Sequence, residues 1–186
     1  MRGGVRRLAV LHRHLLAAAL GLPDLAARLL TAGADIHATD AQGLTPLHCA
    51  ALYGFTSRDR PRLLALFDTL LLAGAEPDKA AAGEVTPLLL LLGARAEPGT
   101  ACDEQVVLAG VERLLDEDVS LEVRDPRGFG PLHLAALHGL PLLVQRLLRA
   151  PVHADRHHRR QRQAGEHRSD RKYRQKLRQR KTPIPA

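Results

Sequence analysis

Two cysteines and several histidines are the side chains of this 186-residue chain that could do nucleophilic chemistry. His48 directly precedes Cys49, which suggests a base beside a thiol nucleophile. Adjacent helical residues point about 100° apart, however, and Cys49 falls on an apolar helix position, so we expect a structural role for both. Cys102 lies in a polar segment, where we expect an exposed thiol without a His or Asn partner.

The sequence contains no recognised catalytic or phosphate-binding motif. It has no glycine-rich phosphate loop, no Cys-x-x-Cys pair, no His-Glu-x-x-His and no Gly-x-Ser-x-Gly. We therefore predict that the protein is not an enzyme, and we assign no catalytic, cofactor-binding or metal-binding residues. No apolar run approaches the about 18 residues of a membrane span, which excludes a transmembrane protein.

Charge divides the chain at residue 150. Residues 1–150 carry 15 Lys and Arg against 17 Asp and Glu, a net charge of −2. Residues 151–186 carry 12 against three, a net charge of +9, so all of the basic excess lies there. The chain is 45% hydrophobic but only 3% aromatic, so its core must consist of Leu, Val and Ala, which favours helices.

The basic residues 151–186 are predicted to form a disordered tail, because their few apolar side chains cannot form a buried face. A solvated extension without a role is one interpretation. Binding of nucleic acid or anionic lipid between Arg156 and Lys181 is a second, and a receptor-read localisation signal is a third. Metal binding is a fourth, through His153, His157, His158 and His167. The abrupt end of the upstream pattern also fits a change of reading frame near codon 150.

A repeated motif organises the chain before this tail. The segment from Thr45 to Gly54 reads TPLHCAALYG and returns from Gly130 to Gly139 as GPLHLAALHG, while a degraded copy begins at Thr86. Threonine before proline is typical of a helix start, because the hydroxyl caps free amides and the proline ring fixes φ. Glycines after paired leucines predict helix ends.

These segments resemble the ankyrin repeat, about four copies of which fit residues 12–150. The copies fall at about 12–40, 41–80, 81–125 and 126–150, with residues 1–11 as an N-terminal extension. The resemblance implies an all-α solenoid of helix-turn-helix units linked by β-hairpin loops. It also implies a non-enzymatic scaffold that binds a partner protein and has no small-molecule substrate.

Two insertions and an unprotected end depart from the repeat pattern. Eight extra residues lie around Phe55–Pro61, and eleven around Glu97–Cys102. Both should be surface loops between the two helices of a repeat, where a longer loop costs little entropy. In the third copy, Arg95 holds the first glycine position and Asp118 the second. The fourth copy stops at Ala150 without a polar cap, so we expect its end to fray or self-associate.

The resemblance places partner contacts on the hairpin tips and the first helices of the second and fourth repeats. The corresponding residues are Gln42, Leu44, Leu52, Tyr53, Arg124, Arg127, Phe129, Leu137 and His138. Tyr53 and Phe129 are of most interest, because aromatic side chains anchor many interfaces and are scarce in this chain. The alternative is that Leu52, Leu137 and Phe129 pack between repeats.

The location of the protein is predicted from its cysteines and its N-terminus. Two cysteines cannot form a disulfide framework, which favours the cytoplasm or another reducing compartment. Residues 1–23 contain arginines, no acidic residue and a short apolar run, so a targeting presequence is an alternative. We favour the interpretation that Leu15 to Gly21 is the first helix of a repeat.

Overall fold

The computed structural model of the chain describes residues 15–150. The predicted extension at residues 1–11 and the predicted tail at 151–186 lie outside the described residues. A helical segment at residues 15–19 is followed by α2 (Pro23–Thr31), α3 (Pro46–Thr56), α4 (Arg60–Leu72), α5 (Pro87–Leu91), α6 (Glu104–Leu115), α7 (Pro131–Leu137) and α8 (Pro141–Arg149). None of the helices in this part of the chain is long and apolar enough to cross a membrane.

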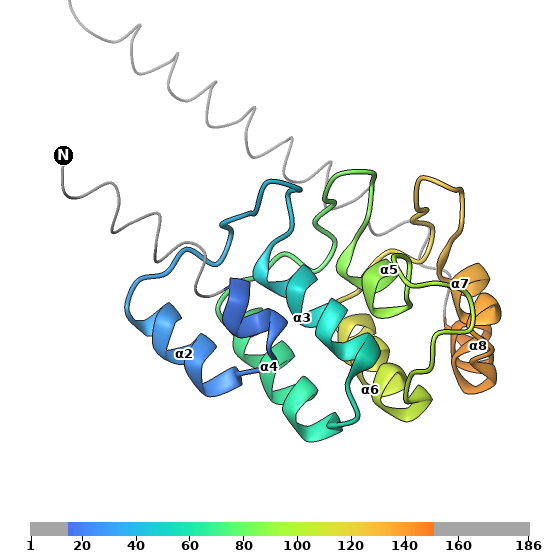
Figure 1. Cartoon of the computed structure of the whole chain (residues 1–186), viewed down its shortest axis with the longest axis horizontal. Helices are drawn as coiled ribbons and strands as arrows, with labels where there is room; N and C mark the ends of the chain where they lie inside the picture. The colour runs from blue at the N-terminus through green and yellow to red at the C-terminus, as the bar shows by residue number, and fades with distance from the viewer. Residues whose placement is uncertain (1–14, 151–186) are drawn as a thin grey trace, which may run out of the picture. The chain divides into compact units, whose positions relative to one another are not determined.

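The helices form pairs that stack in two layers. The first helices of the pairs, α3, α5 and α7, pack side by side, and the second helices α2, α4, α6 and α8 form the other layer. The loops between consecutive pairs all extend to the same side of the stack (Figure 1). The predicted all-α repeat architecture is confirmed.

The connecting loops differ from the predicted β-hairpins, because no residue from 15 to 150 is in a strand. The loops contain tight turns, and those at Asp40 and Asp125 are each closed by two backbone hydrogen bonds. The N–H of Gly43 donates to the C=O of Asp40 at 3.1 Å, and the N–H of Gly128 donates to the C=O of Asp125 at 2.8 Å. The N–H of Asp40 donates to the C=O of Leu44 at 3.1 Å, and the N–H of Asp125 donates to the C=O of Phe129 at 3.0 Å. We call these two turns, and the equivalent turn closed by the N–H of Ala81 and the C=O of Val85, hairpin turns below.

Helix starts and ends follow the predicted residue types. The hydroxyl of Thr86 accepts a hydrogen bond from the N–H of Leu89 at 3.4 Å, as expected of a helix cap. Gly33 and Gly74 follow α2 and α4 with φ of 87° and 92°, the left-handed conformation that ends a helix. Asp118 takes the same conformation after α6, with φ of 57°.

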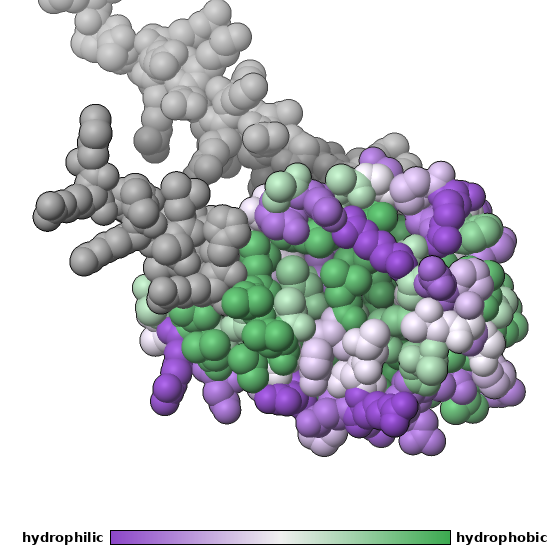
Figure 2. Space-filling model, viewed as in Figure 1, coloured by the Kyte–Doolittle hydropathy of each residue, from purple (hydrophilic) through white to green (hydrophobic). Residues whose placement is uncertain are grey.

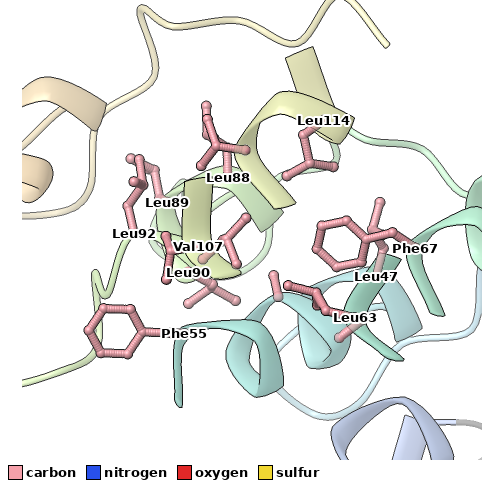
Figure 3. Packing of buried hydrophobic residues seen from close by; sticks show 14 of the residues in the cluster. Leu47, Phe55, Leu63, Phe67, Leu88, Leu89, Leu90, Leu92, Val107 and Leu114 are labelled. Atoms are coloured by element: carbon pink, nitrogen blue, oxygen red, sulfur yellow. The ribbon is translucent and has the colours of Figure 1, made fainter. Parts of the chain in front are cut away.

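One continuous apolar cluster extends from Leu15 to Leu147 through all four pairs. Leucine dominates it, and Phe67 of α4 lies among Leu47, Leu63 and their neighbours (Figure 3). The residues 88–92 are buried on every side. A helix that is apolar all round must be enclosed, which explains why α5 lacks the His-x-Ala-Ala pattern of the other copies.

The first insertion is not a surface loop, and that prediction was wrong. Helix α3 has 11 residues where α7 has seven, and α4 has 13 where α8 has nine. The eight extra residues therefore lengthen each helix by four, about one turn. Apolar residues drive this outcome, because Phe55 in the extra turn of α3 is buried.

The second insertion does form a connecting loop, from the end of α5 to the start of α6, and residues 97–99 are exposed. The assignment of Arg95 to the first glycine position was wrong. Gly93 takes the left-handed conformation there, with φ of 81°. Helix α5 has only five residues, so the turn comes earlier than the spacing of the motif indicates.

The shortness of α5 brings the second and fourth repeats into contact. The rings of Phe55 and His138 meet edge to face with centroids 5.1 Å apart. Nε2 of His138 lies 3.1 Å from the C=O of Gly93. A Cβ on Gly93 would lie 2.7 Å from both rings. Repeats of a solenoid normally touch only their nearest neighbours, so this glycine permits an additional contact.

We predict that Gly93→Ala destabilises the protein more than Gly74→Ala. Both residues are left-handed, so each alanine costs about 1–2 kcal/mol of backbone energy. Only the alanine at 93 also displaces Phe55 and His138, adding about 1–3 kcal/mol, because no atom lies within 4 Å of the Cβ position at Gly74. Urea unfolding followed by circular dichroism measures the difference. Equal losses would contradict the packing role of Gly93.

Candidate protein-binding surface

Two aspartates fix the hairpin turns that begin the second and fourth repeats. Oδ1 of Asp40 accepts hydrogen bonds from the N–H groups of Gln42 and Leu44, each at 2.8 Å. Oδ1 of Asp125 accepts from Arg127 and Phe129, each at 2.9 Å. Each carboxylate closes its turn from inside, so the side chains at the tip point outward and have a defined position.

The environment of Asp125 keeps its carboxyl group ionised. Burial alone would raise its pKa, but the N–H of Phe129, together with the side chain and the N–H of Arg127, outweighs burial and lowers the pKa. Arg127 pairs with the carboxylate at 2.8 Å. The turn therefore has a permanent charge at its base that is already neutralised by its own residues.

The hairpin turns are joined to each other and to the loop after α5. The N–H of Ala82 donates to the C=O of Gln42 at 2.9 Å. Nη1 of Arg95 donates to Oε1 of Gln42 at 2.7 Å, and Nη2 of Arg127 donates to the C=O of Ala94 at 2.9 Å. We call the surface made by these turns and the adjacent sides of α3, α5 and α7 the inner surface.

Seven of the nine predicted contact residues are accessible on this surface. Figure 2 views the first helices from the front and shows apolar residues over them, with more polar residues at the turns above. Three of the seven are exposed and polar: Gln42, Arg124 and Arg127. Four are half-buried and apolar: Leu52, Tyr53, Phe129 and Leu137.

The other two residues do not belong to a binding surface, and their assignment was wrong. Leu44 is only 5% exposed, because its side chain packs into the core below the turn. His138 is only 8% exposed, because its ring fills the space beside Gly93 and Phe55. Both positions face solvent only when the neighbouring repeat leaves them uncovered.

The two aromatic residues have different surroundings. Tyr53 lies against Gly21 of the first repeat, where a Cβ would be 2.2 Å from the ring, so one face of this tyrosine packs between repeats. Phe129 lies between the guanidinium of Arg127, 4.9 Å from the ring centroid, and the stacked ring of His133 at 6.2 Å. These planar groups form a small platform at the fourth repeat.

Comparison with known families identifies the repeats. A model described as ankyrin repeats (many copies) matches residues 15–58, and a model of the ankyrin repeat matches residues 42–82. Residues 15–82 are ankyrin repeats. The same helix pair recurs twice more in the structure, up to Arg149. Ankyrin repeats generally mediate protein–protein interaction and are typically non-enzymatic. No curated protein matches the chain.

Arg95 is the residue of the inner surface that the sequence reasoning missed. It was assigned to a glycine position at the end of a helix, whereas the early turn at Gly93 places it on an exposed loop. From there its side chain reaches Gln42, 53 residues earlier. The available signal was Gly93 itself, the glycine that ends the leucine run.

His48 links consecutive ankyrin repeats instead of acting as a base. Its Nδ1 accepts a hydrogen bond from the N–H of Thr45 at 3.1 Å, so the proton is on Nε2, which donates to the C=O of Val85 at 3.2 Å. The ring is fully buried. Burial lowers the pKa of His48 below its ordinary value of 6.5.

Neither cysteine has the surroundings of a nucleophile. Burial raises the pKa of the Cys49 thiol to about 11, so it remains protonated at neutral pH. Burial, with the nearby charges of Glu104 and Asp103, also raises the pKa of Cys102, which is half-buried. Among residues 15–150, no three His, Cys, Asp or Glu side chains gather as a metal site would require.

We predict that stability falls as the pH drops below about 6.5, because His48 must be neutral in the folded state but can be protonated in the unfolded one. The His48→Gln variant should be less stable at neutral pH and lose less stability between about pH 7.5 and pH 5.5. Urea unfolding at both pH values measures this. An unchanged pH dependence in His48→Gln would exclude the role of this histidine.

Proposed function

We propose that this protein is a non-enzymatic scaffold that binds a partner protein through its inner surface. The proposal rests on one observation: hydrogen bonds join the hairpin turns to one another and to the loop after α5. A surface held in this way loses little conformational freedom on binding, which favours affinity.

The chemical character of the inner surface supports a protein partner. Half-buried apolar side chains on the first helices, among them Leu52 and Leu137, lie beside exposed polar ones at the turns. An apolar centre with a polar rim that includes arginine and aromatic residues is typical of protein interfaces. The amide of Gln42 and the guanidinium of Arg95 already meet there, so they present a preformed polar group to a partner.

Site-specific cross-linking tests the proposal. A photoreactive residue at Gln42, at an exposed tip, should trap a partner from the cell of origin. The same residue at Leu72, which is 86% exposed at the end of α4 in the layer of second helices, should not. Trapping of one protein at both positions with equal yield would contradict binding through the inner surface.

We predict that Leu52→Ala weakens binding of the trapped partner by about 1–2 kcal/mol, because the variant removes an apolar contact near the centre of the surface. Leu72→Ala removes the same side chain from the opposite layer and should leave the affinity unchanged. Isothermal titration calorimetry measures both, and thermal unfolding of both variants shows whether Leu52 contributes to stability. If Leu52→Ala lowers stability but not affinity, Leu52 is a packing residue.

A second function rests on the net charge of +9 in residues 151–186. Such a segment can bind nucleic acid or anionic lipid by releasing counterions, and the affinity then falls steeply with salt. We expect binding of a DNA duplex or of vesicles with anionic lipid to weaken at least about tenfold between about 50 mM and 200 mM salt. Affinity of the inner surface for its protein partner should change much less. A salt-independent affinity for DNA and vesicles would contradict a role of the tail charges.

A further inference from the structure

The side of the fourth repeat that faces away from the third is open among the described residues. The equivalent side of the second repeat is closed, since Leu47 and His48 are fully buried there. In the fourth repeat Leu132 is 39% exposed and His133 is exposed. We call this the open side of the fourth repeat.

The second repeat shows which groups cover such a side. Nε2 of His48 donates to the C=O of Val85, and the C=O of Gln42 accepts from the N–H of Ala82. The two covering groups belong to one short turn and lie three residues apart. The side chain of Val85 is buried at the same place. The closed side therefore binds a short backbone segment with a β-branched residue at its end.

The fourth repeat carries the same two polar groups. By alignment of the turns, Arg127 corresponds to Gln42, and His133 corresponds to His48. A Cβ on Gly130, the position of Thr45, would lie 3.9 Å from Nδ1 of His133, and the histidine ring stacks on Phe129. Within residues 15–150, nothing accepts a hydrogen bond from His133 and nothing donates one to the C=O of Arg127.

Helix α8 ends differently from the earlier second helices. Gly33, Gly74 and Asp118 turn the chain back over the stack with left-handed φ angles. Helix α8 instead ends at Ala150 with φ of −64° and ψ of 131°. The next residue is Pro151, whose ring fixes φ near about −65° and excludes the left-handed turn.

A second copy of the chain is also a poor occupant. If two open sides met face to face, each copy would offer the donor of His133 and the carbonyl of Arg127. Neither copy would supply the complementary N–H and C=O, three residues apart, that these two groups need.

We propose that the open side of the fourth repeat docks a short segment of a partner protein. The segment presents an N–H to the carbonyl of Arg127 and, three residues later, a C=O to Nε2 of His133. The residue that presents the C=O has an apolar, β-branched side chain, which lies over Leu132 and Phe129. This docking site differs from the inner surface, because it forms hydrogen bonds with the backbone of its partner.

A labelled peptide with the sequence of residues 78–88 of this chain is the probe, because that turn covers the equivalent side of the second repeat. We expect the full-length protein to bind it in a fluorescence anisotropy titration. His133→Ala should weaken binding about fivefold, the effect of one neutral hydrogen bond. His37→Ala removes another exposed histidine and should change nothing. The peptide with Val85→Asp should bind at least about tenfold more weakly, because a carboxylate replaces the apolar side chain.

Failure of the probe to bind, or equal binding by His133→Ala and the wild type, would overturn the proposal. His133→Phe keeps a ring that can stack on Phe129 and removes the donor, so it should lose affinity as His133→Ala does. Leu52→Ala should bind the peptide as tightly as the wild type. Leu52 takes no part in the docking site, so a failure of Leu52→Ala to weaken partner binding and a failure of the peptide to bind are separate outcomes.

Discussion

The apolar sides of each helix pair can be buried only by the adjacent pairs, and this constraint governs the structure. Helices of five to 13 residues are too short to enclose a core alone. Their leucines therefore join one cluster from Leu15 to Leu147. The polar links between repeats follow from it, because a buried group such as the ring of His48 must find its partner in the adjoining turn.

The central repeat shows how far this constraint can reshape a motif. Helix α5 has lost its histidine and its alanine pair and retains five enclosed residues. Phe55 in the added turn of α3 and His138 at the end of α7 fill the space next to the end of α5 from both sides. Neighbours two repeats apart therefore share a contact through Gly93. Unfolding of one end repeat should then destabilise repeats beyond the adjacent one, unlike in a stack where only nearest neighbours interact.

Sequence patterns predicted the parts of the fold that depend on local chemistry. Threonine or glycine before proline starts helices, and Gly33 and Gly74 end them, since these residues act through their own backbone. The patterns failed where distant residues decide. Phe55 was assigned to a loop because its partner His138 is 83 residues away, and Arg95 was misplaced because the length of α5 depends on what encloses it. Burial of Leu44 was missed for the same reason.

The same reasoning separates binding residues from packing residues at equivalent positions. Tyr53 and His138 hold the same position of the repeated motif, yet His138 fills a gap between repeats while Tyr53 covers a glycine with one face only. His48 and His133 share a motif, but only His48 has a following turn to accept its proton among the described residues. A repeat position has no fixed role, because its neighbour determines whether the side chain is covered. The two sites that we propose for partner recognition therefore lie where the neighbouring helix is short or where no neighbouring turn covers the repeat among the described residues, beside the early turn after α5 and at the open side of the fourth repeat.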